Sequence, residues 1–208
     1  ANGIRVDAGS VYLPNFIMGN RIGLSATLSG VHIGNALSGI VADTRPDTNA
    51  TNFNPSGISL VIGPANVISD NKGTNNNAFP DVLGSDNGGI VITGASNSVK
   101  VAGNTIGLAE FPPGTPVNSI AYGNDGDGVI VTIGGNTIGA GNVIAANARH
   151  GIVVKGSGTA STSIVGNSIG VSPAFAGNLG LGNGVDGIHI NAASATTVGG
   201  PAGGDAYT

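Results

Sequence analysis

The stretch Gly151-Ile152-Val153-Val154, together with Gly166-Asn167-Ser168-Ile169-Gly170, decides the fold of this chain. The first motif is a Gly followed by β-branched residues, which favour strands, and the second is a Gly-Asn corner that holds one Ile. The same two motifs occur twice earlier, as Gly3-Ile4-Arg5-Val6 with Gly19-Asn20-Arg21-Ile22-Gly23, and as Gly89-Ile90-Val91-Ile92 with Gly103-Asn104-Thr105-Ile106-Gly107. The chain therefore contains three copies of one repeat.

Each copy also has a second strand opener, and an asparagine lies four residues before its Gly. These openers are Gly39-Ile40, Gly128-Val129 and Gly187-Ile188, and the first two copies then close with Asn-Val-Ile at 66–68 and 142–144. Asn tolerates the left-handed backbone conformation, and its amide can bond its own loop or the equivalent Asn one coil away. The predicted corner residues are Asn20, Asn35, Asn66, Asn104, Asn124, Asn142, Asn167 and Asn183.

Strands this short are not stable alone, but strands stacked in every turn of a solenoid bury one another's Val and Ile side chains. The sequence therefore predicts an all-β fold, a single-stranded parallel β-helix, and crossover chirality predicts that it is right-handed. If each opener and each corner motif marks one coil, roughly nine or ten coils would form a rod about 45 Å long. Residues 1–208 are expected to form a single domain, with polar insertions near 42–56 and 71–87.

The motif Gly141-Asn142-Val143-Ile144, the opener at 151–154 and the corner motif at 166–170 resemble the right-handed parallel β-helix repeats of large bacterial surface and secreted proteins. The resemblance covers nearly the whole chain. It implies a structural or adhesive rod, located extracellularly or on the cell surface. The same family also includes polysaccharide lyases and hydrolases, so a catalytic role and a glycan-binding adhesin segment stay open as alternatives.

Composition excludes several classes of protein. The chain has 38 Gly and 24 Asn but only 9% charged residues, and its mean hydropathy of +0.24 and net charge of −4 are unlike those of disordered chains. Seven Lys and Arg residues are scattered along the sequence, so no nucleic-acid partner is expected. No apolar run reaches the roughly 18 to 20 residues of a membrane span. Cysteine is absent, which excludes disulfides and thiolate metal sites.

Acidic residues are few, and only Asp125 and Asp127 form a close pair. With Asn124 they are the candidate ligands for calcium, the one ion or cofactor considered. However, the pattern Asn-x-x-Asp-Gly recurs at 183–187, which favours turn residues over ligands. The polygalacturonase-like signature of Asn-x-Asp, Asp-Asp, Gly-His-Gly and Arg-x-Lys is absent. We therefore expect no catalytic residue and no enzymatic activity.

The three histidines are His32, His150 and His189, each beside or within an expected strand. No two of them have the i, i+2 or i, i+4 spacing that is typical of metal ligands on one element. They are interpreted as exposed strand residues.

No capping segment is recognisable at either end of the sequence, although solenoids normally cap their first and last coils. Two arrangements follow as expectations. The chain is a piece of a longer rod and continues into adjoining coils, or its ends stack head to tail on neighbouring copies of itself. Glycans, bound through the inserted loops, are a further candidate partner.

Overall fold

The computed structural model describes residues 2–7, 14–23, 34–43, 58–72, 87–94, 97–108, 123–156, 161–171 and 181–200. This part of the chain folds into seventeen short strands and contains no helix. No helix that is long and apolar enough to cross a membrane therefore occurs among these residues.

The strands form three sheets, and every strand pair is parallel. Sheet 1 contains, in spatial order, β1 (Ile4–Asp7), β4 (Ile40–Asp43), β7 (Gly88–Thr93), β10 (Asp127–Val131), β13 (Ile152–Lys155) and β16 (Ile188–Asn191). Sheet 2 contains β2 (Asn15–Ile17), β5 (Ile58–Ile62), β8 (Asn97–Val101), β11 (Thr137–Ile138), β14 (Ser163–Ile164) and β17 (Thr197–Val198). Sheet 3 contains β3 (Arg21–Ile22), β6 (Val67–Ile68), β9 (Thr105–Ile106), β12 (Val143–Ile144) and β15 (Ser168–Ile169).

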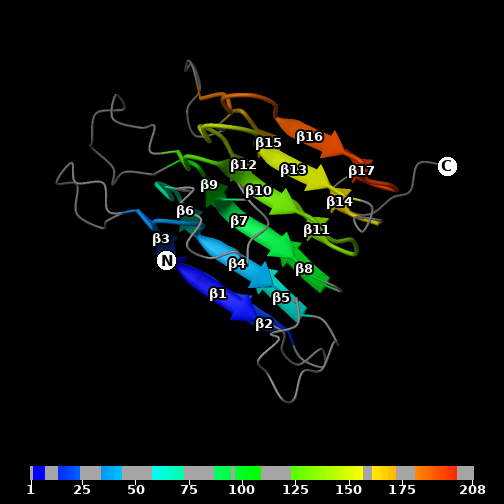
Figure 1. Cartoon of the computed structure of the whole chain (residues 1–208), viewed down its shortest axis with the longest axis horizontal. Coiled ribbons are helices and arrows are strands. Elements are labelled where there is room, and N and C mark those ends of the chain that lie inside the picture. The colour runs from blue at the N-terminus through cyan, green and yellow to red at the C-terminus, as the bar shows by residue number, and fades with distance from the viewer. Residues whose placement is uncertain are drawn as a thin grey trace.

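Each strand pairs with the strand three positions later in the chain, so one coil consists of three consecutive strands, one in each sheet. The predicted all-β parallel β-helix is thus confirmed, with three faces. Figure 1 shows the stack, which rises from β1 near the N-terminus to β16 at the opposite end.

The predicted count of nine or ten coils is wrong, because sheet 1 has six strands and the stack about six coils. All six strand openers lie in sheet 1, whereas the Gly-Asn corner motifs lead into strands of sheet 3. An opener and the corner motif that follows it therefore belong to one coil, not to two. At about 4.8 Å per coil, the six coils give a stack about 29 Å long rather than about 45 Å.

The core lies inside the coil. There the inward side chain of each strand packs on the equivalent side chain of the next coil, and these side chains form columns along the axis. In sheet 3 the column contains Ile68, Ile106 and Ile144, which are fully buried. In sheet 1 the outward residues Val41, Val91 and Ile130 are buried as well, and they form a separate apolar cluster. Apolar burial is thus continuous along the axis, as the solenoid argument requires.

Glycine has two different roles at the two motifs. Both glycines of the corner motif have positive φ, for example 67° at Gly103 and 91° at Gly107, a conformation that costs other L-residues energy. The opener Gly89 lacks a positive φ, and there the requirement is space. A Cβ on Gly89 would lie 2.8 Å from the carbonyl oxygen of Gly128 and 2.9 Å from the side chain of Asn124.

The two predicted insertions fall mainly outside the described residues. Of the range 42–56, Ala42 and Asp43 belong to β4 and are buried. Of the range 71–87, Asn71 is buried and Asn87 half-buried. Residues 44–56 and 73–86 lie outside the described part of the chain.

Candidate functional site

Two rows of asparagine side chains run along the axis of the stack. In each row, every asparagine makes a hydrogen bond to the asparagine of the next coil. The first asparagine ladder leads into the strands of sheet 3. In it Asn20, Asn66, Asn104 and Asn142 each donate from Nδ2 to Oδ1 of the next member, at 2.8 to 3.1 Å, and the ladder ends at Asn167. Most of these amides also donate to a backbone carbonyl of the preceding coil, as Asn104 does to Ile62 at 2.9 Å.

The second asparagine ladder lies before the strands of sheet 1. It consists of Asn35, Asn71, Asn124, Asn147 and Asn183, with Nδ2 to Oδ1 distances of 2.7 to 2.9 Å. The eight corner asparagines selected from sequence all lie in the two ladders. Sequence reasoning missed Asn71 and Asn147. Asn71 has no opener Gly four residues later, so its place in the ladder follows only from the coil register. Asn147 has the same local signal as Asn35, Asn124 and Asn183, because the opener Gly151 lies four residues after it, and this signal was overlooked.

The candidate calcium ligands have other partners in this arrangement. The Oδ1 atom of Asn124 accepts hydrogen bonds from the backbone N–H and the Nδ2 of Asn71. Asp127 is 4% exposed, accepts a bond from the backbone N–H of His150 at 2.9 Å, and lies 3.9 Å from Nη1 of Arg149. Only Asp125 has an exposed side chain. The oxygen atoms of Asn124 and Asp127 therefore hold coils together.

Asp127 belongs to a column of residues that directly precede the opener Gly of sheet 1. In this column a side chain accepts a hydrogen bond from the backbone N–H one coil later. Oδ1 of Asn2 accepts from Ser38, Oγ of Ser38 from Gly88, Oδ1 of Asp127 from His150, and Nδ1 of His150 from Asp186. The column brings His150 and Asp186 together, although they are 36 residues apart in the chain.

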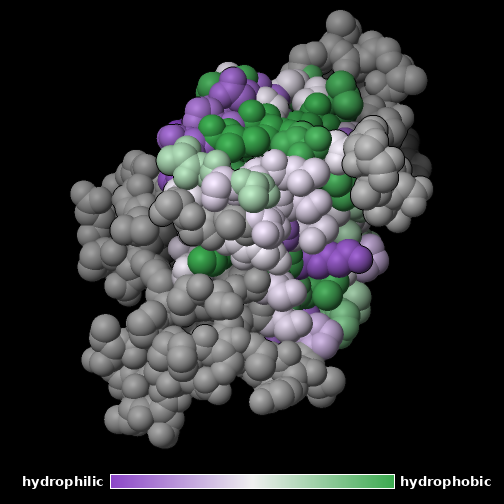
Figure 2. Space-filling view, turned by 90° about the vertical axis from the view of Figure 1, so that its right-hand side faces the viewer, coloured by the Kyte–Doolittle hydropathy of each residue, from purple (hydrophilic) through white to green (hydrophobic). Residues whose placement is uncertain are grey.

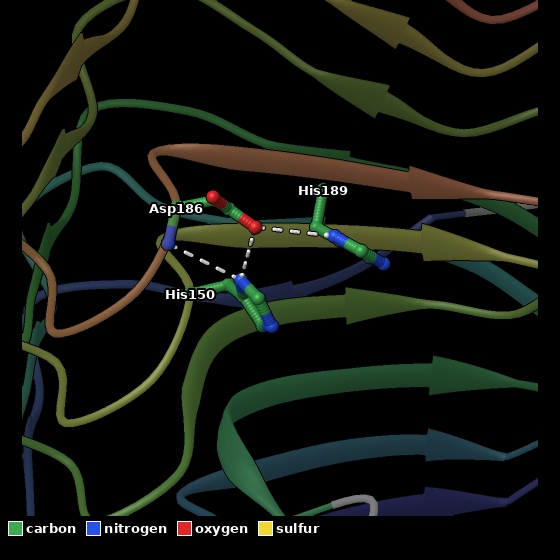
Figure 3. Close-up of side chains that lie close together, drawn as sticks. All are labelled: His150, Asp186 and His189. Atoms are coloured by element: carbon green, nitrogen blue, oxygen red, sulfur yellow. Dashed lines mark hydrogen bonds and ion pairs between the residues drawn. The ribbon is translucent and has the colours of Figure 1, made fainter.

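His189 completes a cluster with these two residues. Oδ2 of Asp186 lies 3.1 Å from Nδ1 of His150 and 3.2 Å from Nδ1 of His189. The two imidazole rings lie side by side with centroids 4.7 Å apart, and the carboxylate reaches both of them (Figure 3). His189 lies in β16, on the outward face, because its neighbours Ile188 and Ile190 occupy core columns. We call these three residues the His-Asp-His cluster.

The cluster lies at the protein surface. The side chain of His150 is 12% exposed, whereas those of His189 and Asp186 are 41% and 50% exposed. Within the described residues, these are the His and acidic side chains whose potential ligand atoms all lie within 4.8 Å of one another. Two imidazole nitrogens and a carboxylate oxygen can bind a transition metal, or can form a charge-assisted hydrogen-bond network when the rings are protonated.

Sequence reasoning did not find this cluster and treated the histidines as isolated. His150 and His189 are 39 residues apart, so no local spacing rule applies to them. A signal was nevertheless present. With the openers Gly151 and Gly187 aligned as equivalent positions, His150 falls beside Asp186 and His189 lies three residues beyond it. His32 lies outside the described residues.

Comparisons of the chain with protein-family models, with curated proteins and with solved structures gave no match.

Proposed function

We propose that this chain is a structural or adhesive rod, extracellular or on the cell surface, whose coils stack head to tail on neighbouring copies. The observation that carries the proposal is the exposure of core-column residues in the last described coil. The competing hypotheses of a polysaccharide-cleaving enzyme and of a glycan-binding segment have no comparable support from the described residues.

At each end of the described stack, the terminal strands of sheets 1 and 2 are edge strands. In the described part of the chain, β16 and β17 pair on one side only, as do β1 and β2 at the opposite end. A parallel strand edge carries unpaired N–H and C=O groups and is a template for another strand. Because all strands run in the same direction, a second copy moved along the axis would place β1 on β16 and β2 on β17.

The last described coil also exposes side chains whose counterparts in the four preceding coils are buried. Ile190 follows Val154 in its column and Val198 follows Ile164, and these two partners are 0% and 2% exposed. Ile190 is 46% and Val198 49% exposed. Figure 2 shows hydrophobic surface gathered toward this upper end of the molecule. A further coil would remove both side chains from water, which is favourable by about 25 cal/mol for each Å² of apolar surface.

The asparagine ladders supply a direction for this stacking. From one asparagine of a ladder to the next, the amide nitrogen faces the next coil and the amide oxygen faces the previous one. Head-to-tail copies keep donors directed toward acceptors, whereas head-to-head copies would direct donor ends toward each other. The ladders therefore favour an open, polar filament over a closed dimer.

Electron microscopy of the purified chain tests the proposal. We expect uniform filaments with an axial repeat near one stack length, about 29 Å. The double variant Ile190→Lys/Val198→Lys should abolish them, because it places two charges on the stacking surface without altering a buried residue.

The matched control is Ser98→Lys/Ala140→Lys, which adds the same charges at exposed positions in the middle of the stack and should leave the filaments intact. A parent chain that stays monomeric at every concentration would rule out head-to-tail stacking. Filaments that persist in the end variant would show that another surface joins the copies.

A further inference from the structure

We propose that the His-Asp-His cluster binds a divalent transition metal ion of the zinc class. The inference does not rest on filament assembly, because all three ligands belong to one copy of the chain. It is carried by the convergence of His150, Asp186 and His189 from two successive coils.

The first argument is the spacing of the ligand atoms. Zinc binds imidazole nitrogen and carboxylate oxygen at about 2.0 to 2.2 Å, so two ligands of a tetrahedral ion lie about 3.3 Å apart. The corresponding distances here are 3.1 Å from Asp186 Oδ2 to His150 Nδ1 and 3.2 Å to His189 Nδ1. All three ligand atoms lie within 4.8 Å of one another, so a movement of the two rings toward each other would place them around one ion.

The lone pair of His150 Nδ1 also favours a bound cation. The backbone N–H of Asp186 points at Nδ1 of His150 from 3.3 Å, and in the ring tautomer that accepts this hydrogen bond Nδ1 carries no proton. An unprotonated Nδ1 beside a carboxylate oxygen at 3.1 Å places two lone-pair-bearing atoms in contact. A bound cation removes this repulsion. The cation would replace the hydrogen bond that the Asp186 amide donates to His150. This bond is long, at 3.3 Å, and exposed.

The donor set decides which ions fit. Two imidazole nitrogens and one carboxylate suit zinc, cobalt, nickel and copper, whereas calcium and magnesium prefer oxygen ligands alone. The exposure of Asp186 and His189 lets an ion enter and leaves a fourth position for water. The site differs in both position and chemistry from the calcium ligands considered at Asn124, Asp125 and Asp127.

Metal binding would join the last two coils of sheet 1. His150 lies in the turn that leads into β13. Asp186 and His189 lie one coil later, in the turn before β16 and in β16 itself. Because the ligands converge only in the native register, an ion that binds the folded state stabilises this pairing. Zinc should accordingly raise the unfolding temperature of the parent chain.

Isothermal titration of zinc into the chain tests this inference. We expect one ion per chain, and we expect cobalt in its place to give the visible absorption of a tetrahedral site. The variants His189→Ala and Asp186→Asn should each weaken binding at least about tenfold. Both side chains are at least 41% exposed, so the fold should survive, and circular dichroism checks that it does.

His32→Ala is the control for unspecific binding by histidine and should leave the zinc affinity unchanged. Asp125→Ala, which removes the exposed member of the earlier calcium candidates, should do the same. The inference is overturned by a parent chain that binds no zinc at one ion per chain. It is also overturned by zinc binding that survives both His189→Ala and Asp186→Asn in folded protein.

Discussion

At the scale of single residues, asparagine holds this fold together at positions where most proteins place apolar side chains. A buried amide is costly unless its donors and acceptors are paired, and the ladders pair them coil by coil. Asn104 is 1% exposed, donates to Asn142 and Ile62, and accepts from Asn66. Each rung thus satisfies a side chain and a backbone carbonyl at once.

Asn104→Ala should lower the free energy of unfolding by about 3 kcal/mol, because several buried hydrogen bonds of about 1 kcal/mol each are lost. Asn20→Ala, at the exposed end of the same ladder, should cost less than about 1 kcal/mol. Urea unfolding of the two variants beside the parent measures the difference. Equal losses at both positions would mean that the ladder does not stabilise the coil.

At the scale of elements, the corner between two sheets depends on glycine for a reason beyond backbone conformation. Gly107 and Gly156 have nearly the same φ, 91° and 93°. A Cβ on Gly107 would lie 2.1 Å from the carbonyl oxygen of Ala145 in the next coil, whereas a Cβ on Gly156 would meet nothing within 4 Å. Close packing of coils, and not only φ, therefore restricts the corner before Leu108.

The substitution Gly156→Ala should cost about 1 to 2 kcal/mol, which is the penalty of the left-handed conformation alone. Gly107→Ala has the same penalty and a backbone clash in addition, so we expect a loss of at least about 3 kcal/mol. Thermal unfolding of both variants provides the comparison. If the two variants lose the same stability within error, the packing of the next coil does not restrict the residue at this corner.

The sequence was sufficient to predict elements but not their assignment to coils. Openers and corner motifs are local signals, so the strands at 40–43 and 105–106 follow from the β-branched residues and flanking Gly. Which strands share a coil depends on long-range pairing, and counting each motif as a coil overestimated the stack. The same limit hid Asn71, and it hid the approach of His150 to His189, which appears only with the register known.

At the scale of the whole molecule, the two ends of the described stack differ in how far their core columns are exposed. At the first coil the core columns of sheets 2 and 3 are almost fully buried, with Ile17 and Ile22 8% and 6% exposed, and those of sheet 1 are partly buried at Ile4 and Val6. At the last described coil Ile190 and Val198 are 46% and 49% exposed. A solenoid with one open apolar end gains stability from each added coil. We therefore propose that β17 of one copy pairs with β2 of the next copy.

Disulfide cross-linking tests that claim most directly, because the natural chain has no cysteine. Thr197 and Phe16 occupy the same column of sheet 2, so head-to-tail copies would place them on adjacent strands about 4.8 Å apart, within the range a disulfide spans. Mixing Thr197→Cys with Phe16→Cys under mild oxidation should give a covalent dimer of the two variants. The account is contradicted if Thr197→Cys links equally well to itself or to Ser98→Cys, a mid-stack control.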